Sequence, residues 1–349
     1  MNDGILKQAE DRACGAANEG KKFHLWGTLA LLVGVAVSIA LIAYHNFSAV
    51  AGAVWSVGWG LGFVVAIQIV CIVINGFAWR ILFPLAQPAC KKILIPARWI
   101  RDALNYLLPS AILGGEVVGV RLLVARGCDI NTSSASVVAD KTLEVMGLFL
   151  FVLTGIIIFL KRERNSYMTH WAISGLVVLS AVLAVFLLSQ RWGLLKLVDK
   201  VILKFAGNCG GRYGGENMSI HDLVWQMYAK IPRLIAAVFL HTAVWTLGPL
   251  QIWTSLHFMG YKTGLQDAFI LESLCQVVIA AAFMMPLSLG AQEAAYMSIA
   301  GLFGIPPPVG LAISLVQRLK DLLVGIPGLL LWQGFEGHRL WTLWKGKRK

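Results

Sequence analysis

The stretch 132–160, TSSASVVADKTLEVMGLFLFVLTGIIIFL, decides what kind of fold this sequence can adopt. Its last 16 residues hold no charged side chain, and the stretch exceeds the roughly 20 residues that a helix needs to cross a bilayer. Asp140, Lys141 and Glu144 stand near its start. Charged side chains in a membrane helix are costly and usually face a bundle interior or a wet cavity. The stretch therefore predicts a membrane-spanning helix with a polar inner face.

The composition of the whole chain supports a membrane protein. Of its 349 residues, 58% are hydrophobic and 14% are charged, and the mean hydropathy is +0.71. A soluble domain has about a quarter of its residues charged, so this composition excludes a soluble enzyme. We attribute the net charge of +12 to basic loops on one membrane face and not to nucleic-acid binding. The six cysteines show no CxxC spacing, so neither a zinc site nor a disulfide framework is expected.

Further apolar stretches complete an all-α integral membrane fold of about seven to eight transmembrane helices. Six of them have the length of a span: residues 25–44, 53–78, 171–189, 234–257, 268–285 and 309–333. Two more apolar stretches, 97–125 and 286–304, are interrupted by prolines and glycines. Irregular backbone at membrane depth is tolerated only inside protein or beside a wet cavity. We therefore expect these two stretches to be re-entrant elements built from broken helices.

An internal repeat relates the two interrupted stretches. An offset of 177 positions aligns Pro109 with Pro286, Glu116 with Glu293, Lys141 with Arg318, and Glu144 with Asp321. Charges inside membrane segments are rare, so the matched charges outweigh the small number of identities. The repeat halves cover about 53–160 and 231–335, with a linker over 190–230. Whether the halves are parallel or inverted stays open.

The same offset places 91–108 opposite a predicted span, which would bring the crossings to eight. Eight crossings would put both chain ends and the basic loop 161–164 in the cytoplasm, as the positive-inside bias prefers. We therefore expect a cytoplasmic N-terminal tail over 1–22, one polytopic domain over 23–335 and a basic C-terminal tail over 336–349.

Two groups of residues carry a resemblance to a known family. The first half has Asn105-x-x-Leu108-Pro109, then Gly114-Gly115-Glu116 and Arg121. The second half has Pro286, Ser288, Gly290 and Glu293, then Arg318 and Asp321. Together they resemble the two signatures of the flippase-like family that includes the transmembrane flippase region of lysylphosphatidylglycerol synthases. Gly290-Ala291-Gln292-Glu293 is most similar to the branch associated with hopanoid biosynthesis.

The resemblance covers about residues 25–335 and has consequences for function. It implies a multi-pass protein of the bacterial inner membrane that moves lipids between leaflets or between membranes. The sequence has no counterpart of the lysyl-transferring domain of the synthases, so that activity is not carried over. It also has no GxxxxGK[ST] motif, so an ATPase is not expected.

The expected site is a polar cavity between the two re-entrant elements that would hold a lipid head group. Its expected residues are Asn105, Pro109, Gly114, Gly115, Glu116, Arg121, Lys141, Glu144, Pro286, Ser288, Gly290, Gln292, Glu293, Arg318 and Asp321. Glycines would let the head group approach the backbone, and half-helix N-termini would offer it free N–H groups. The alternative is structural, because the same charges could pair with one another and fasten the short helices to neighbouring spans.

Three functions remain in competition. The first is transport of a lipid, with a hopanoid as substrate or a phospholipid as the alternative. The second is an integral membrane enzyme with Glu116 and Glu293 as an acid–base pair. The third is a scaffold for lipid-biosynthesis proteins. None requires a cofactor, a metal or a nucleic acid, and the expected partners are membrane lipids.

Overall fold

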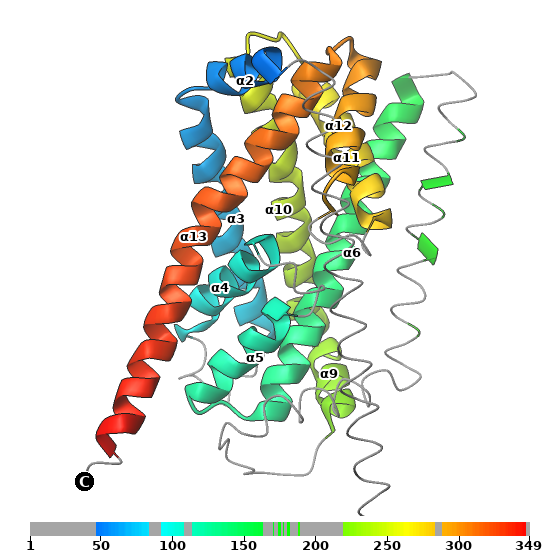
Figure 1. Cartoon of the computed structure of the whole chain (residues 1–349). Helices are drawn as coiled ribbons and strands as arrows, with labels where there is room; N and C mark the ends of the chain where they lie inside the picture. Colours follow the sequence, from blue (N-terminus) through cyan, green and yellow to red (C-terminus); the bar gives the residue numbers. More distant parts are fainter. Residues whose placement is uncertain are drawn as a thin grey trace, which may run out of the picture.

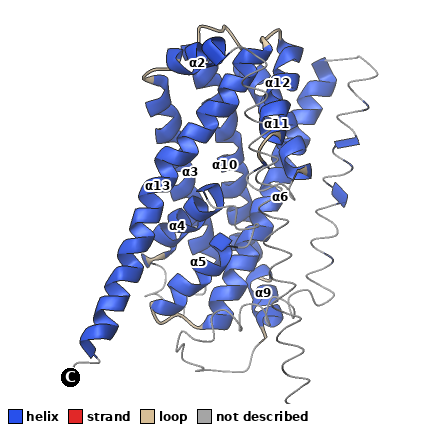
Figure 2. Ribbon diagram, in the orientation of Figure 1, coloured by secondary structure: helices blue, strands red, loops and turns tan. Residues whose placement is uncertain are grey.

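A computed structural model describes residues 47–83, 92–107, 114–162, 219–282 and 288–346, together with single positions between 170 and 188. Within these residues all regular structure is helical (Figures 1 and 2). The predicted span 25–44, most of the predicted span 171–189, Pro109 and Pro286 lie outside the described residues. The expectation of an all-α fold is therefore confirmed for the described residues.

Among the described residues, three helices are long and apolar enough to cross a membrane. They are α3 (Gly60–Leu82), α6 (Ile130–Arg162) and α10 (Ile231–Phe258). They contain most of the predicted spans 53–78, 132–160 and 234–257. The predicted span 309–333 lies inside α13 (Pro307–Gly346), a 40-residue helix of about 60 Å at 1.5 Å per residue. In Figure 1, α13 runs along the whole bundle.

Four helices are shorter than a bilayer core. They are α4 (Leu94–Leu107), α5 (Gly114–Ala125), α11 (Leu265–Ala281) and α12 (Ala291–Ala300), which a short 3₁₀ turn, η4 (Gly301–Phe303), continues. The 17 residues of α11 reach about 25 Å, less than the roughly 30 Å of hydrocarbon. The expectation that 268–285 is a full span is therefore not confirmed by the described part of α11.

The short helices lie at two levels of the bundle. In Figure 1, α4 and α5 lie beside the lower half of α6, whereas α11 and α12 lie near its upper half. Two further short helices mark the ends of the bundle, with α2 (Phe47–Ser56) at the top and α9 (Ile220–Tyr228) at the bottom. The molecule is thus a bundle of long helices with a pair of short helices inserted at each level.

The long helices run in two opposite directions. From their first residues, α3 and α13 run downward in Figure 1, and α6 and α10 run upward. The upper end of α6, at Arg162, and the lower end of α13 therefore lie at opposite ends of the bundle. The expectation that the basic loop 161–164 and the C-terminus share one membrane face is therefore not confirmed, because α6 and α13 end at opposite ends of the bundle.

Small residues bring the helices into close contact. A Cβ atom on Gly147 of α6 would lie 2.9 Å from the backbone nitrogen of Thr242 on α10. A Cβ atom on Gly310 of α13 would lie 2.6 Å from the carbonyl oxygen of Tyr296 on α12. Helices in a bilayer gain no hydrophobic free energy from meeting each other, so close van der Waals packing of this kind holds them together.

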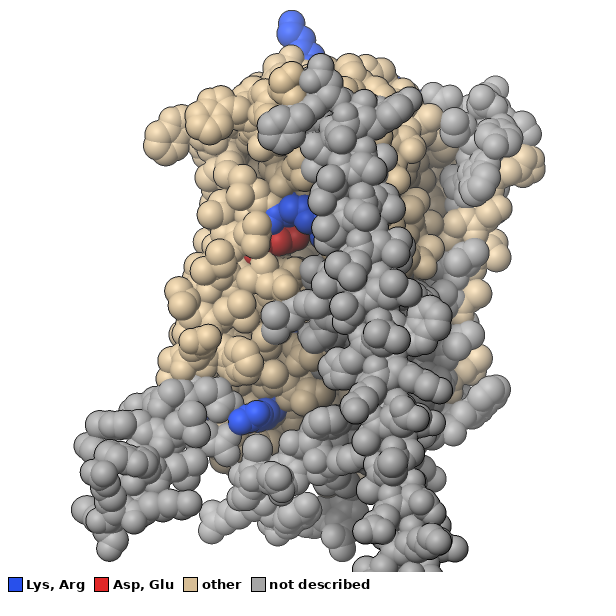
Figure 3. All heavy atoms as spheres, viewed as in Figure 1, with Lys and Arg blue, Asp and Glu red and all other residues tan. Residues whose placement is uncertain are grey.

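The outer surface is suited to lipid. Large apolar side chains such as Phe239, Ile235 and Leu330 are exposed on the long helices. The described surface in Figure 3 is largely uncharged, apart from a few small charged spots.

Cys128, after α5, takes part in a disulfide, which the scattered cysteine spacing did not predict.

Candidate functional site

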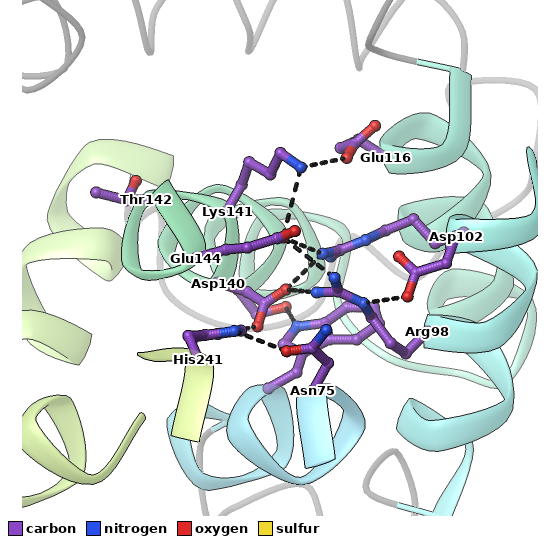
Figure 4. Close-up of polar contacts among 12 residues, drawn as sticks. Asn75, Arg98, Asp102, Glu116, Asp140, Lys141, Thr142, Glu144 and His241 are labelled. Carbon is purple, nitrogen blue, oxygen red and sulfur yellow. Dashed lines mark hydrogen bonds and ion pairs between the residues drawn. The ribbon is translucent and has the colours of Figure 1, made fainter. Parts of the chain in front are cut away.

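A buried ionic network joins α4 to α6 (Figure 4). Asp140 of α6 is fully buried and accepts hydrogen bonds from Arg98 Nη1 at 2.9 Å and Arg101 Nη2 at 2.6 Å. Arg98 Nε also donates to Asp102 Oδ2, one helical turn further along α4, at 2.9 Å. Two guanidinium groups thus share one carboxylate where water is excluded, which makes each charge dependent on the others.

The network continues to a third helix. His241 of α10 is fully buried, with Nδ1 3.0 Å from Asn75 Oδ1 on α3 and Nε2 3.2 Å from Asp140 Oδ1. The histidine therefore links α10 to both α3 and α6. Such polar contacts between helices orient neighbouring spans in a membrane protein.

The network also has an exposed edge. Glu144 Oε2 lies 3.2 Å from Arg98 Nη2 and 3.4 Å from Lys141 Nζ. Lys141 Nζ in turn lies 3.9 Å from Glu116 Oε1 at the start of α5. The Lys141 side chain is 35% exposed, against 0% for Asp140. Lys141 is therefore the most accessible residue of this cluster, and Glu116 lies beside it.

The start of α5 is held by α4. Asn105 Oδ1 accepts a hydrogen bond from the Gly115 N–H at 3.2 Å, and Asn105 Nδ2 donates to Glu116 Oε1 at 3.3 Å. A Cβ atom on Gly115 would fall on the Arg101 carbonyl oxygen and on the Asn105 side chain. The glycine thus serves close packing of two helices. The expectation that it leaves room for a ligand is wrong for Gly115.

The second site lies at the start of α12. Glu293 is 1% exposed, and its Oε2 accepts from the Gly290 N–H at 2.8 Å. Its other oxygen, Oε1, accepts from Arg318 Nε of α13 at 3.1 Å. Gly290 has φ +81°, a backbone conformation that residues other than glycine rarely adopt. Glu293 thus caps its own helix and binds a base on the next one.

These contacts correct one part of the expected chemistry. Free N–H groups at the two half-helix starts were expected to receive a head group. The N–H groups of Gly115 and Gly290 are instead taken by Asn105 and Glu293. A ligand that binds either of these two N–H groups has to compete with a side chain of the protein itself.

The same pairing occurs in both halves. Glu116 in the first turn of α5 pairs with Lys141 on α6, and Glu293 in the first turn of α12 pairs with Arg318 on α13. We call these two the acid–base pairs. The acid three residues after each base differs between the halves. Glu144 pairs with Lys141, whereas Asp321 lies 3.2 Å from Lys320.

The remaining predicted residues fall into the same two regions. Asn105, Gly114 and Gly115 lie at the α4–α5 junction, and Arg121 lies nearly two turns further along α5. Ser288 and Gly290 precede α12, and Gln292 Nε2 donates to Ser314 Oγ of α13 at 3.3 Å. Every predicted site residue except Pro109 and Pro286 is thus described.

Sequence reasoning missed the most buried charges. Arg98, Arg101 and Asp102 stand in an apolar stretch, and Asp140 directly precedes Lys141. The rarity of charge in membrane segments, which selected Lys141 and Glu144, applies equally to these four residues. The motif-based selection passed over them because they lie outside the short signatures.

Comparisons with known proteins place the chain in a family. No curated protein and no solved structure matches this sequence significantly. Residues 31–328 match the family described as the lysylphosphatidylglycerol synthase TM region. That match covers well over half of the 349 residues and contains both acid–base pairs. The chain therefore belongs to the lysylphosphatidylglycerol synthase transmembrane-region family.

Proposed function

We propose that this protein transports a lipid across the membrane by receiving its polar head group at the two acid–base pairs. The family and the three candidate spans support a lipid-related membrane function. The observation that carries the proposal is the repeated pairing of Glu116 with Lys141 and of Glu293 with Arg318. A protein that only needed to cross the bilayer would be cheaper to insert without these charges.

The pairs have the properties of an exchangeable site. In each pair the acid is more buried than the base, with Glu116 at 11% and Lys141 at 35% exposed, and Glu293 at 1% and Arg318 at 21%. A phosphate oxygen can replace the carboxylate as the partner of the exposed base. A hydroxyl can instead donate to the carboxylate. In either case the pair recloses when the head group leaves.

The arrangement of elements supports alternating use of the two pairs. The helices α5 and α12 begin at residues 114 and 291, and α6 and α13 begin at 130 and 307, both 177 positions apart. In Figure 1, α5 lies low and α12 high, and α6 and α13 run in opposite directions. We infer an inverted repeat in which α4–α5 and α11–α12 are re-entrant elements entering from opposite faces. Transporters commonly place such broken helices around their substrate site.

The substrate class follows from the chemistry of the second site. Gln292 and Glu293 offer a hydrogen-bond donor and acceptors beside Arg318. This combination suits a polyol head, as in a hopanoid, and Gly290-Ala291-Gln292-Glu293 is the motif that resembles the hopanoid branch. A phospholipid is the alternative, because Lys141 and Arg318 suit a phosphate. We place the protein in the bacterial inner membrane.

The test is leaflet exchange in liposomes containing the purified protein. A labelled hopanoid and a labelled phospholipid are compared for native protein, Glu116→Gln and Glu293→Gln. We expect exchange to fall at least about tenfold in both variants, since each loses the charge that holds its base. Asp267→Asn is the matched control, because Asp267 pairs with Arg162 outside both sites. The faster lipid identifies the substrate class.

Other outcomes favour the competing functions. Folded Glu116→Gln and Glu293→Gln proteins that exchange lipid like the native protein would overturn the proposal. A scaffold predicts silent variants that still bind lipid-biosynthesis proteins. An enzyme predicts that the variants move lipid but form no product.

A further inference from the structure

A chain of hydrogen-bonded side chains runs through the bundle beyond the acid–base pairs. Gln251 Nε2 donates to Gln68 Oε1 at 2.9 Å, and Gln68 Nε2 donates to the Tyr106 hydroxyl at 3.0 Å. At the other end, Lys320 Nζ lies 3.4 Å from Gln251 Oε1 and 3.2 Å from Asp321 Oδ1. We call these five residues the central polar chain.

The central polar chain reaches from one acid–base pair towards the other. Tyr106 is the neighbour of Asn105, which holds the start of α5 and bonds Glu116. Asp321 lies three residues after Arg318 and shares its face of α13. The chain therefore begins on α4, where the adjacent residue Asn105 bonds Glu116, crosses α3 and α10, and ends on α13, where Arg318 bonds Glu293.

The residue types are unusual for a buried position in a membrane protein. Gln68, Gln251 and Lys320 are each at most 9% exposed. Apolar side chains there would be cheaper to insert, and hydrogen bonds between membrane helices contribute little net stability. Glutamine and tyrosine each both donate and accept, so a passing hydroxyl or phosphate oxygen can take the place of either partner.

We propose that the central polar chain is the route by which the head group passes between the two acid–base pairs, and that it admits heads bearing several hydroxyl or phosphate oxygens. This inference rests on the proposed function. A route must bind well enough to admit its cargo and weakly enough to release it. The two glutamine amides and the tyrosine phenol meet that requirement, because they offer partners without trapping a charge, and Lys320 and Asp321 form the charged end of the chain on α13.

Lys320 is the residue that opens the route. It is the one cation among the five, and its bond to Gln251 is the longest link of the chain. This link joins α13 to α10 through a long, flexible side chain. Turning Lys320 away from Gln251 frees an amide oxygen and presents an ammonium group to a phosphate.

The experiment removes hydrogen bonding from the middle of the route at nearly constant volume. Gln68→Met and Gln251→Met proteins are reconstituted, and leaflet exchange is measured for a labelled hopanoid polyol and for labelled phosphatidylglycerol. Binding of a short-chain form of each lipid and thermal stability are measured in detergent. Gln276→Met is the matched control, because Gln276 bonds Glu272 within α11, away from the chain.

We expect Gln68→Met and Gln251→Met to lose at least about tenfold in exchange, while binding and stability stay near native. Lys320→Met should slow phosphatidylglycerol more than the hopanoid polyol. Gln276→Met should behave like the native protein.

Three results would overturn the route, and a fourth would remove the role of Lys320. Native exchange in both glutamine variants shows that the head group does not pass there, and the proposed function survives if Glu116→Gln and Glu293→Gln still lose exchange. Exchange, binding and stability falling together shows that the chain only fastens helices. Equal slowing of both lipids by Lys320→Met removes the role of Lys320 in admitting phosphate. If the native protein exchanges neither lipid, the proposed function fails with the route.

Discussion

Asp140 is the residue on which the most buried charges depend. It is the shared acceptor of Arg98 and Arg101, and the Arg101 guanidinium also stacks over the Trp79 ring, 5.0 Å from its centroid. Removing one partner of a buried pair leaves the other charge without compensation, which is far costlier than losing an exposed pair. The main role of Asp140 is therefore structural, because it connects α6 to α4.

Asp140→Asn should destabilise the protein strongly. We expect a loss of about 3–5 kcal/mol, because two buried guanidinium groups lose their common carboxylate. The measurement is the apparent melting temperature in detergent. Asp267→Asn, at a partly exposed pair, should cost no more than about 1 kcal/mol. Equal shifts in the two variants would contradict the assignment of Asp140 as the centre of the network.

The sequence predicted some site residues well and others poorly. Glu116, Lys141, Glu293 and Arg318 were selected as charges in membrane segments, and the structure pairs them across helices. The sequence could not show that Arg98 and Arg101 would meet Asp140, about 40 positions away. Such pairing depends on how α4 packs on α6, which no local pattern encodes.

At the scale of helices, the junction of α4 and α5 depends on one glycine. Gly115 touches the backbone of Arg101 and the side chain of Asn105. A Cβ atom on Gly119, one turn later, would lie 3.4 Å from its nearest neighbour, which belongs to the flexible Arg101 side chain. The two glycines lie on the same helix but differ in whether the backbone of another helix lies against them.

Gly115→Ala should separate α5 from α4. We expect a destabilisation of about 1–3 kcal/mol from overpacking, together with loss of the Asn105 hydrogen bond to Gly115. Gly119→Ala should be neutral or slightly stabilising, because alanine favours the helix. Thermal unfolding of both variants in detergent measures the difference. The idea fails if Gly115→Ala is as stable as the native protein.

The lengths of helices were easier to predict than their depth in the bilayer. An uncharged run such as the end of 132–160 predicts a span because length and hydropathy are local properties. The stretch 268–285 is similarly apolar, yet α11 ends at Ala281 after 17 residues. The helix lies against α12, which follows it along the chain, and such tertiary contacts are not visible in a local pattern.

At the scale of the whole molecule, the inverted repeat makes a topological prediction. Ala125 at the end of α5 and Leu302 in η4 are both exposed and lie 177 positions apart. Introduced singly as Ala125→Cys and Leu302→Cys into a protein without its six native cysteines, they should react with a membrane-impermeant maleimide from opposite sides of the membrane. Labelling is compared in spheroplasts and in everted vesicles. Reaction of both positions from one side would instead establish a parallel repeat.

The enclosure of the Asp140 network also decides what dissolved salt can do to this protein. Mobile ions weaken attractions between exposed charges over a Debye length of about 8 Å at physiological ionic strength, but they act far less on buried pairs. Asp140, Arg98 and Arg101 are at most 2% exposed, whereas Arg162 in its pair with Asp267 is 49% exposed. Concentrated salt during purification will loosen the outer pair first. The buried ion pairs between α4 and α6 will persist in concentrated salt much as they do in dilute buffer.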